Sequence, residues 1–534
     1  MNPTRQPIFS MRPLPVSGTV GRGVDAAPSS AGEREAFGRR TQFVRDGVSD
    51  GWPVERRSGG DCNDNATAFQ QRRAALPLPG GEGWGEGGRS TIFPPHQGAS
   101  RQGSVLIIVL WIVFGLVSIT VYFAHSMVFE LRASDNRIAG IEAEQAIEGA
   151  RRYFNCVLSN LNQPGALPDP QTYQSEAAPV GDARFWLIGR GSDQDAPTTA
   201  HFGLIDEASK LNLNYASSNM LFSLPRMTPQ LVASILTWRS TNTTSTSGGA
   251  ESDTYMRLQP PYLCKNAPFE SVDELRLIYG MDMETLYGED ANLNGILDPN
   301  ENDGDVLPPA DNKDGRLNPG LLEYVTVYSH EPGTATNGTP KFDITTTAGV
   351  TSLRTNLVAL FGSSRANQII PPGSTTTFTS PLQFYISKKL TATEFAQVES
   401  SIRGSRLQGL VNVNTACTAV LACLPGLTNG QAAQLTTYRQ SNTNNLNASV
   451  AWVTQVLSQN DAITAGPYLT GRGYQYTADV AAVGHYGRGY RRTRFVFDTS
   501  QGTPVSLHRE DLSHLGWALG KQARDKWLLA KQTP

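Results

Sequence analysis

The sequence of 534 residues lacks an excess of charge of one sign. Its 45 Lys and Arg residues nearly balance its 48 Asp and Glu residues, which gives a formal net charge of −3. Proteins that bind nucleic acid through its phosphates usually carry a clear basic excess. The balance therefore argues against a nucleic-acid-binding protein.

Motifs that mark common enzyme classes are also missing. The sequence contains no G-x-S-x-G nucleophile elbow, no H-E-x-x-H zinc motif and no phosphate-binding loop. His485, His508 and His514 near the C-terminus do not have the spacing of metal ligands, and we expect them in surface or packing positions. We predict that the chain is not an enzyme, and we assign no catalytic residue.

Cysteine is scarce. The five cysteines, none of them in a C-x-x-C pair, are Cys62, Cys156, Cys264, Cys417 and Cys423. This pattern weakens the zinc-ribbon and thioredoxin-like interpretations. Cys417 and Cys423 are close enough to cross-link only if the chain bends between them. We favour two small buried thiols there, and the alternative of a disulfide stays open.

Residues 1–103 lack the apolar periodicity of a folded domain. Pro, Gly, Ser and Arg dominate, and residues 76–88 (LPLPGGEGWGEGG) are of low complexity. Such a composition offers little burial to offset the entropy of ordering the chain. We predict a disordered leader. The alternative is translated upstream sequence ahead of a later start, although no Met lies between Met11 and Met127.

The character of the chain changes at Gly103. Residues 104–124 (SVLIIVLWIVFGLVSITVYFA) form a run of 21 residues without a charge. At about 1.5 Å per residue this run spans roughly 31 Å, which matches a hydrocarbon core of about 30 Å. A cleaved secretory signal would have a shorter apolar region that ends in small residues, whereas this run continues to Tyr122 and Phe123. We predict a membrane span.

An amphipathic segment follows the span. Between charged residues, apolar side chains recur at helical spacing at Ile138, Ile141, Ala146, Ala150, Phe154 and Val157. No strong helix breaker separates this segment from the span. We therefore predict one long helix over residues 104–160, half in lipid and half on a soluble domain.

This helix resembles the N-terminal helix of type IV pilins and pseudopilins. In that family a prepilin peptidase cuts after a Gly, and the new N-terminal residue is methylated. The junction between Gly103 and Ser104 fits such a site. Most members carry Glu at the fifth mature position, whereas this chain has Ile108, which resembles only the K-type minor pseudopilins of type II secretion systems.

A second segment supports the same resemblance. Residues 183–189 and 201–206 read as strands and lead into D-E-x-x-K-L-N-L-N at 206–214, which looks like the entry to the helical domain of K-type pseudopilins. Residues 269–280 look like another helical element, and residues 324–328 (YVTVY) follow in the family's order.

An internal repeat begins in this segment, with an offset of 200 residues. Residues 211–239 align without gaps on residues 411–439. The identical pairs are Asn212/Asn412, Asn214/Asn414, Ala216/Ala416, Leu221/Leu421, Leu224/Leu424, Pro225/Pro425 and Arg239/Arg439. Each unit reads as two helices around a Leu-Pro turn, as in helix-hairpin-helix or SAM-like units, with the second Asn as an N-cap.

Helix-hairpin-helix units can also bind DNA. DNA-binding hairpins of the Gly-apolar-Gly form let backbone N–H groups approach a phosphate. Here the first hairpin, residues 225–228 (PRMT), has neither Gly, and the second, residues 425–428 (PGLT), has only one. We therefore interpret both units as packing modules.

The most specific chemical motif is the segment 290–301 (DANLNGILDPNE). It matches the twelve-residue calcium loop, with side-chain or carbonyl ligands predicted from Asp290, Asn292, Asn294, Ile296, Asp298 and Glu301. Gly295 at the sixth position permits the sharp turn, and Glu301 would close the site with both oxygens. We predict that calcium is the cofactor. A possible second calcium site comprises Asp303, Asp305, Asp311 and Asp314, without a closing Glu.

The predicted fold is α+β, with a pilin-like α/β domain, an inserted helical domain and C-terminal antiparallel strands. The expected segments are 1–103 leader, 104–160 helix, 161–210 pilin-like strands, 211–330 helical domain with the calcium loop, 331–409 insertion or linker, 410–460 second repeat, and 461–534 β-rich end. Within the last segment, residues 474–482, 493–497 and 505–509 alternate like strands, and residues 512–519 form a short apolar cover.

The resemblance implies a role and a location. K-type pseudopilins sit at the tip of a periplasmic filament with the minor pseudopilins I and J, contact other pseudopilins, and are processed by prepilin peptidase. It implies a single-pass protein of the inner membrane with most of the chain in the periplasm, and no nucleic-acid partner. The alternative is a membrane-anchored periplasmic DNA-uptake receptor that uses the helix-hairpin-helix units.

Overall fold

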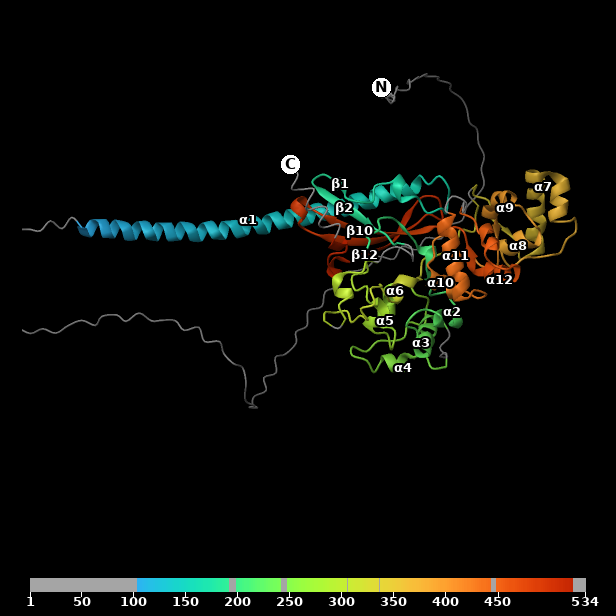
Figure 1. The fold of residues 1–534 in the computed structure, drawn as a ribbon, viewed down its shortest axis with the longest axis horizontal. Coiled ribbons are helices and arrows are strands. Elements are labelled where there is room, and N and C mark those ends of the chain that lie inside the picture. Colours follow the sequence, from blue (N-terminus) through green and yellow to red (C-terminus); the bar gives the residue numbers. More distant parts are fainter. Residues whose placement is uncertain are drawn as a thin grey trace, which may run out of the picture. The chain divides into compact units, whose positions relative to one another are not determined.

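The computed structural model describes residues 103–191, 198–241, 247–304, 306–335, 337–442 and 448–521. Every described residue belongs to one compact unit. The predictions for the leader, for Cys62 and for Asp305 lie outside the described residues. The described unit combines helices with an antiparallel sheet, which confirms the α+β class (Figure 1).

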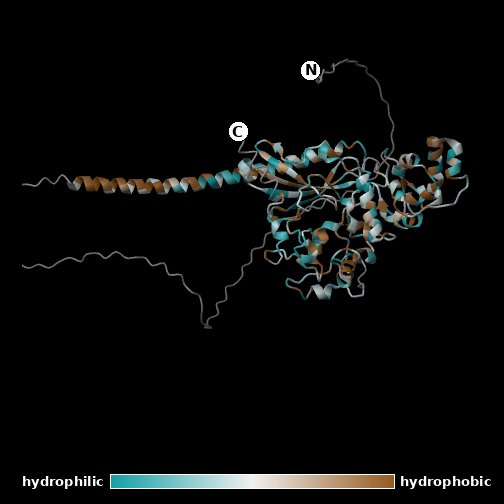
Figure 2. Ribbon diagram, in the orientation of Figure 1, coloured by the Kyte–Doolittle hydropathy of each residue, from teal (hydrophilic) through white to brown (hydrophobic). Residues whose placement is uncertain are grey.

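Helix α1 runs without interruption from Gly103 to Ser159, which confirms the prediction of one long helix (Figure 1). Its first half is apolar (Figure 2), and the side chains of residues 105–134 are exposed, that of Trp111 by 75%. By length and composition alone α1 is able to cross a membrane, which is consistent with a single-pass anchor.

The second half of α1 packs on the sheet through small side chains. Ala143, Ala146 and Ala150 are fully buried there, followed by Phe154 and Leu158. The apolar face predicted from the sequence was partly wrong, since Ile138 and Ile141 are exposed by 50% and 54%. Alanine on the buried face lets the helix backbone approach the sheet closely, which larger side chains would prevent.

The main sheet is antiparallel along the order β1-β2-β10-β11-β12, and β3 also pairs with β10. Its strands are β1 (Ala178–Val180), β2 (Ala183–Ile188), β3 (Ile205–Asp206), β10 (Gln475–Val483), β11 (Arg491–Asp498) and β12 (Val505–Asp511). The predicted C-terminal strands are confirmed, whereas the strand predicted over residues 201–206 is reduced to β3. Both faces of the central strand β10 are covered, because every residue of it is buried.

Two apolar clusters cover the two faces of the sheet. On the α1 face, Phe154 packs with Phe185 and Phe495 among other residues. On the opposite face, Trp186 and Ile188 pack with Leu519 of the C-terminal segment. The end of the predicted apolar cover over residues 512–519 is therefore part of a core. The short helix η10 (Ser513–Leu515) lies in the same segment of the chain.

The chain leaves the sheet after β3 and returns to it at β10, and the intervening residues form three successive segments. The first contains η2 (Glu207–Ser209), β4 (Leu211–Asn212), α2 (Ser218–Phe222), α3 (Pro229–Arg239), α4 (Ser252–Tyr255), η3 (Val272–Leu277), α5 (Met283–Tyr287), η4 (Pro299–Glu301), α6 (Leu321–Tyr324) and β5 (Val325–Thr326). The helical element predicted over residues 269–280 is thus a shorter 3-10 helix, η3. The parallel pairing of β4 with β5 closes the segment.

The second segment falls where an insertion or linker was predicted, and it is folded. It contains β6 (Phe342–Asp343), α7 (Thr347–Ile369), α8 (Pro381–Ser387), α9 (Ala392–Val398), η5 (Glu399–Ser401) and β7 (Ile402–Arg403). The strands β6 and β7 again pair in parallel. Its buried side chains, such as Phe384 and Phe395, belong to the same core as those of the first segment.

The third segment contains the second copy of the sequence repeat. It consists of β8 (Val411–Asn412), α10 (Thr418–Ala422), α11 (Asn429–Ser441), η7 (Ala451–Gln455), α12 (Gln459–Ala465), η8 (Gly466–Tyr468) and β9 (Leu469–Thr470). Here β8 and β9 pair in parallel. A two-stranded parallel ladder therefore closes each of the three segments.

The repeated asparagines organise the start of each copy, but not as predicted. In each copy the side-chain oxygen of the first Asn accepts a hydrogen bond from the backbone N–H of the second Asn. The bond from Asn214 to Asn212 and the bond from Asn414 to Asn412 are both 3.0 Å long. The second Asn donates to a distant backbone carbonyl, at Phe269 from Asn214 and at Gly471 from Asn414. The N-cap of α2 is Ser217 and that of α10 is Cys417, so the prediction of an Asn cap was wrong.

Candidate calcium site

The predicted calcium loop, residues 290–301, lies between α5 and the end of η4. Its two terminal carboxylates, Asp290 and Glu301, are each exposed by only 1%, and Asn294 is exposed by 2%. Buried carboxylates need partners, because the loss of water around a charge costs several kcal/mol. The loop therefore has to supply these partners itself or take them from a bound ion.

Backbone N–H groups of the loop point toward its first residue. The two carboxylate oxygens of Asp290 accept hydrogen bonds from the N–H groups of Asn294 and Gly295, both at 2.9 Å. Gly295 has a φ of +70°, a conformation that disfavours residues with a Cβ, and it brings the backbone into the sharp turn. The sixth position of the motif thus has the conformation that the sequence predicted.

Three further predicted ligands meet at one oxygen. The side-chain amides of Asn292 and Asn294 donate to Asp298 Oδ2 at 2.8 and 3.1 Å. The amide oxygen of Asn294 accepts from the N–H of Ile296 at 2.7 Å. The structure therefore brings the third, fifth and ninth positions of the loop together.

Glu301 closes the loop on itself. Its two carboxylate oxygens accept hydrogen bonds from the N–H groups of Ala291 at 3.1 Å and Asp298 at 3.0 Å. Burial raises the pKa of Glu301 to about 8, and the charges of Asp290 and Asp298 add to this increase. Burial also raises the pKa of Asp290, although the Arg190 guanidinium opposes it.

These observations test whether the loop suits a cation. Two buried carboxylates whose pKa values are raised destabilise the folded chain near neutral pH, and a nearby divalent cation would reverse that effect. All side-chain donors are oxygen atoms or amides, the ligand types that Ca²⁺ prefers. The residues present therefore fit a calcium ion.

Two arginines, the buried Arg492 and the half-buried Arg190, hold the back of the loop against the sheet. Arg492 on β11 donates to the carbonyl oxygens of Asn292 and Leu293, and it forms an ion pair at 2.7 Å with Asp479 of β10. Both side chains of this pair are fully buried. Burial alone would raise the pKa of Asp479, but Arg492 and Arg494 hold it at about 2.

The second arginine comes from the end of β2. Arg190 donates to the Leu293 carbonyl at 3.1 Å and pairs with Glu323 of α6 at 2.8 Å. On the other side, Asn292 donates to the carbonyl of Trp517 at 3.4 Å. The loop is consequently attached to the sheet, to the first helical segment and to the C-terminal cover.

The second acidic patch forms a more open loop. Asp311 accepts from the N–H groups of Asp303 and Gly304 at 3.0 and 2.9 Å, whereas Asp314 is exposed and bonds to its neighbours Asn312 and Arg316. Asp305 lies outside the described residues. The structure thus brings Asp303 close to Asp311 and leaves Asp314 at the surface.

The acidic pair ahead of the repeat joins the sheet to both repeat copies. Asp206 accepts hydrogen bonds from Asn412 and Thr415 of the third segment, both at 2.7 Å. Glu207 accepts from Thr326 of the first segment and from Thr477 of β10. Burial raises the pKa of Asp206 to about 6, whereas Lys210 and the two threonines bring the pKa of the buried Glu207 below its usual range.

The arginines of the repeat units face inward. Arg239 donates to the carbonyls of Leu213 and Ala216, and Arg439 donates to the equivalent carbonyls of Val413 and Ala416. These contacts connect the second helix of each unit to the start of the first. They support the interpretation of both units as packing modules, because a guanidinium used in this way is not offered to a phosphate.

The predicted processing site lies at the start of α1. Gly103 is the first residue of the helix, and Ile108 is exposed by 58% on the apolar half. Within the third segment, Cys423 is buried and its thiol donates to the carbonyl of Ala419 at 3.1 Å, whereas Cys417, also predicted to be buried, is half-buried. Among the described cysteines, Cys156, Cys264, Cys417 and Cys423, no disulfide is formed.

Two histidines that the sequence predicted only as surface or packing residues, His485 and His508, lie among acidic side chains. The His485 ring nitrogens lie 2.6 Å from Glu142 and 2.8 Å from Asp135 on α1. His508 comes together with Asp273 and Glu510. Asp135 and Glu142 are distant from His485 in sequence, and Asp273 is distant from His508, so local spacing does not reveal these contacts.

Comparison with known proteins gives one family match. Residues 209–287 match the family model for protein K of the type II secretion system. No curated protein matches the chain. Among solved structures, it is similar to a chain of the GspK-GspI-GspJ complex from the type 2 secretion system of enterotoxigenic Escherichia coli, at 9% identity and a TM-score of 0.35, with 72% of this chain and 98% of that chain covered.

Proposed function

Through residues 209–287 this chain belongs to the protein K family of the type II secretion system, and we propose that it is the minor pseudopilin at the tip of the pseudopilus. Protein K is a structural component of the secretion system and not an enzyme.

One observation carries the proposed position at the tip. A single helix has an exposed apolar half and a second half that packs on an antiparallel sheet, and residues 207–474 are inserted between two strands of that sheet, β3 and β10. We interpret α1 and the sheet as the pilin-like part that enters the filament. An insertion of this size would obstruct a further subunit stacked ahead of it.

The residue at position 108 supports the same position. In a pilin filament, Glu at the fifth mature position can pair with the N-terminal amine of a neighbouring subunit. A carboxylate at the centre of a membrane span costs about 2.5–3.5 kcal/mol on insertion scales, and less near its end. A subunit with nothing ahead of it has no such amine to meet, and Ile108 avoids the unpaired charge.

The partners follow from the family. We propose that the chain assembles with minor pseudopilins I and J, that prepilin peptidase cuts between Gly103 and Ser104, and that the new N-terminus is methylated. The apolar half of α1 would anchor the chain in the inner membrane, with the folded part in the periplasm. We further propose that the inserted segments contain SAM-like helix pairs and that Asp290, Asn292, Asn294, Ile296, Asp298 and Glu301 bind calcium.

The experiment that tests the tip position labels the chain in assembled filaments. We expect immunogold against the folded part to mark one end of each filament, at very few copies, and a tagged chain to co-purify with I and J. Ile108→Glu should slow the start of assembly or leave it unchanged, with Ile108→Leu as the matched control. Label along the whole filament would contradict the proposal.

A second measurement separates this function from DNA uptake. The detergent-solubilised full chain should not retard duplex DNA in a gel-shift assay at physiological salt, because Arg239 and Arg439 are engaged with backbone carbonyls. Retardation that is lost when the hairpin residues 225–228 and 425–428 are exchanged would favour the DNA-uptake receptor instead.

A further inference from the structure

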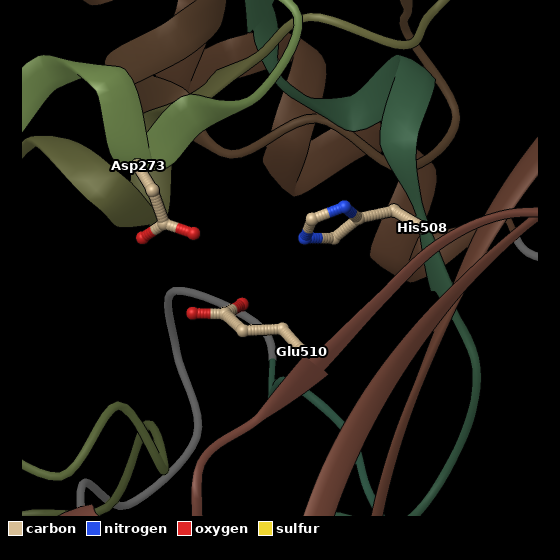
Figure 3. A group of neighbouring side chains, drawn as sticks. All are labelled: Asp273, His508 and Glu510. Carbon is tan, nitrogen blue, oxygen red and sulfur yellow. The ribbon is translucent and has the colours of Figure 1, made fainter. Parts of the chain in front are cut away.

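A second group of ligand-type side chains lies apart from the calcium loop. Asp273, His508 and Glu510 each offer a metal-ligand atom within 4.8 Å of the others (Figure 3). Within the described residues they form a group that could hold a metal ion. Figure 3 shows the three side chains directed toward a common space. Asp273 belongs to η3, and the other two belong to β12.

The strand geometry explains why two of the three face the same way. Residues two apart in a strand project from the same face. His508 and Glu510 are half-buried, whereas their neighbours Leu507, Arg509 and Asp511 are exposed. A rigid edge strand therefore presents an imidazole and a carboxylate side by side, and η3 brings a second carboxylate to them.

The three side chains line a small cavity of about 40 Å³. This volume is enough for an ion and a water molecule, because one water needs about 10–15 Å³ of accessible cavity volume. The charged side chains around the cavity are those of Glu207, Lys210, Asp273, Arg494 and Glu510, three carboxylates against two cations. The walls therefore leave negative charge in excess when His508 is neutral.

The two cations are shared with other carboxylates. Lys210 bonds to Glu207 at 3.2 Å, and Arg494 lies 3.3 Å from Asp479 but 3.6 Å from Glu510. Arg276, which does not line the cavity, is 3.5 Å from Asp273. Within the described ranges, the His508 ring makes an aromatic contact with Tyr328, at 5.9 Å between centroids, and no hydrogen bond of its ring nitrogens is formed.

We propose that Asp273, His508 and Glu510 bind a divalent transition-metal ion, and that the chemistry of these three ligands favours zinc. This ion would link strand β12 to residues 209–287, the segment that matches the protein K family model. One imidazole and two carboxylates are ligands that Zn²⁺ accepts, and water would complete a tetrahedron. Ca²⁺ prefers ligand sets made only of oxygen, so the imidazole distinguishes this site from the calcium loop.

Closing the site requires only small movements. With metal–ligand bonds of about 2.0–2.1 Å, ligand atoms of a tetrahedron lie about 3.4 Å apart. The observed limit of 4.8 Å therefore calls for shifts of an ångström or so. Rotations of half-buried side chains supply such shifts without a change in the backbone.

The test is zinc titration of the detergent-solubilised full chain by calorimetry, after chelator treatment and in excess Ca²⁺ to saturate the calcium loop. We expect one zinc ion per chain and a higher melting temperature. Loss of a side chain that only hydrogen-bonds to a metal ligand typically weakens metal binding by about 10–100-fold. His508→Ala removes a ligand itself, so it should weaken zinc binding by more than this. His514→Ala, an exposed histidine near the same strand, is the matched control and should bind as the wild type does.

A second variant and a second probe keep the result decisive. If His508→Ala does not fold, Asp273→Asn should show the same loss, because an amide is a poor zinc ligand. Co²⁺ in place of zinc should give visible absorption bands that His508→Ala abolishes. Equal binding by wild type, His508→Ala and Asp273→Asn would mean an adventitious ion only. This result, or the absence of zinc binding, would overturn the proposal. Neither result would affect the proposed tip function.

Discussion

Single side chains decide how the calcium loop is attached. Arg492 pairs with Asp479 at full burial and donates to two carbonyls of the loop, so one guanidinium serves both the sheet and the loop. At the other end of the loop, Glu301 is buried beside Asp290, and burial raises the pKa values of both. In the first arrangement each buried charge has a partner of opposite sign, whereas in the second a bound cation would offset the charge of the two carboxylates.

Removal of calcium should destabilise the chain through Glu301. If the ion binds only the folded state, it stabilises that state by about 2.7 kcal/mol at a hundredfold excess over its dissociation constant. We expect chelator to lower the melting temperature of the solubilised full chain, and Glu301→Ala to abolish that response. Asn300→Ala, one position away in the same loop, should keep the response. An unchanged melting curve in chelator would refute the site.

Truncation of Arg492 should be strongly destabilising. Removal of one partner from a buried ion pair leaves the other charge without compensation, which costs about 3–5 kcal/mol. We expect Arg492→Ala to lose stability on this scale in denaturant unfolding, and to weaken the calcium response as well. The matched control is Arg491→Ala, since Arg491 is the exposed neighbour on β11. Equal loss in the two variants would show that the pair with Asp479 is not responsible.

At the scale of elements, α1 is held by the turn that joins β10 to β11. Gly484 and Gly489 in this turn approach the backbone of Ala139 so closely that a Cβ at either glycine would lie 2.2–2.3 Å from it. Beside them, His485 in the helix η9 (His485–Gly487) lies between Asp135 and Glu142, and Arg488 also pairs with Asp135. The turn therefore clamps α1 near the point where its exposed first half ends.

This clamp should weaken as the pH rises. The carboxylates of Glu142 and Asp135 raise the pKa of His485 above its usual value near 6.5. A group whose pKa is raised in the folded state stabilises that state fully below its unfolded pKa, and the contribution is lost as the pH rises through the folded pKa. Hydrogen exchange in residues 135–142 of the full chain should be slower at pH 5.5 than at pH 8.5, after correction for intrinsic rates.

The control for the clamp is the neutral variant His485→Gln. It should remove the pH dependence of protection, whereas His514→Gln at an exposed site should leave it in place. The same pH dependence in His485→Gln would show that other groups control this part of α1.

At the scale of the whole molecule, α1 contains both an exposed apolar half, able by length and composition to cross a membrane, and a half that packs on the sheet. The leader would have to be removed before α1 can enter a filament, and the proposed cut lies where α1 begins. The inserted segments join the sheet through Asp206 and Glu207 as well as through the calcium loop. These contacts connect α1 and the sheet, the part that we propose enters the filament, to the part that carries the family match.

Processing should therefore produce a mature chain that begins at Ser104. A bulky residue in place of Gly103 should leave the precursor in the membrane, because the peptidase of pilin-like proteins cuts after Gly. Mass spectrometry of the membrane-extracted protein is the measurement, with Gly98→Phe as the control that should still be processed. An intact N-terminus in the wild type, or a cut near Ala124, would contradict the pseudopilin interpretation.

The sequence alone determined the features that depend on local order. Charge-free length indicated a helix able to cross a membrane, and helical spacing indicated its continuation to the folded body. The D-E-x-x-K segment indicated the resemblance to K-type pseudopilins, and alternation indicated the C-terminal strands. The spacing of oxygen-bearing residues predicted a calcium loop, because all of its proposed ligand positions lie within twelve residues. Each of these signals rests on neighbours in the chain.

Tertiary structure alone decided the contacts between distant residues. It placed alanines rather than Ile138 and Ile141 against the sheet, it used Asn214 to bridge to Phe269 instead of capping a helix, and it brought Asp273 to His508. The physical reason is the same in each case. Which face of a helix is buried, and which side chains share a cavity, depends on packing between elements, and the pattern within one element does not contain that information.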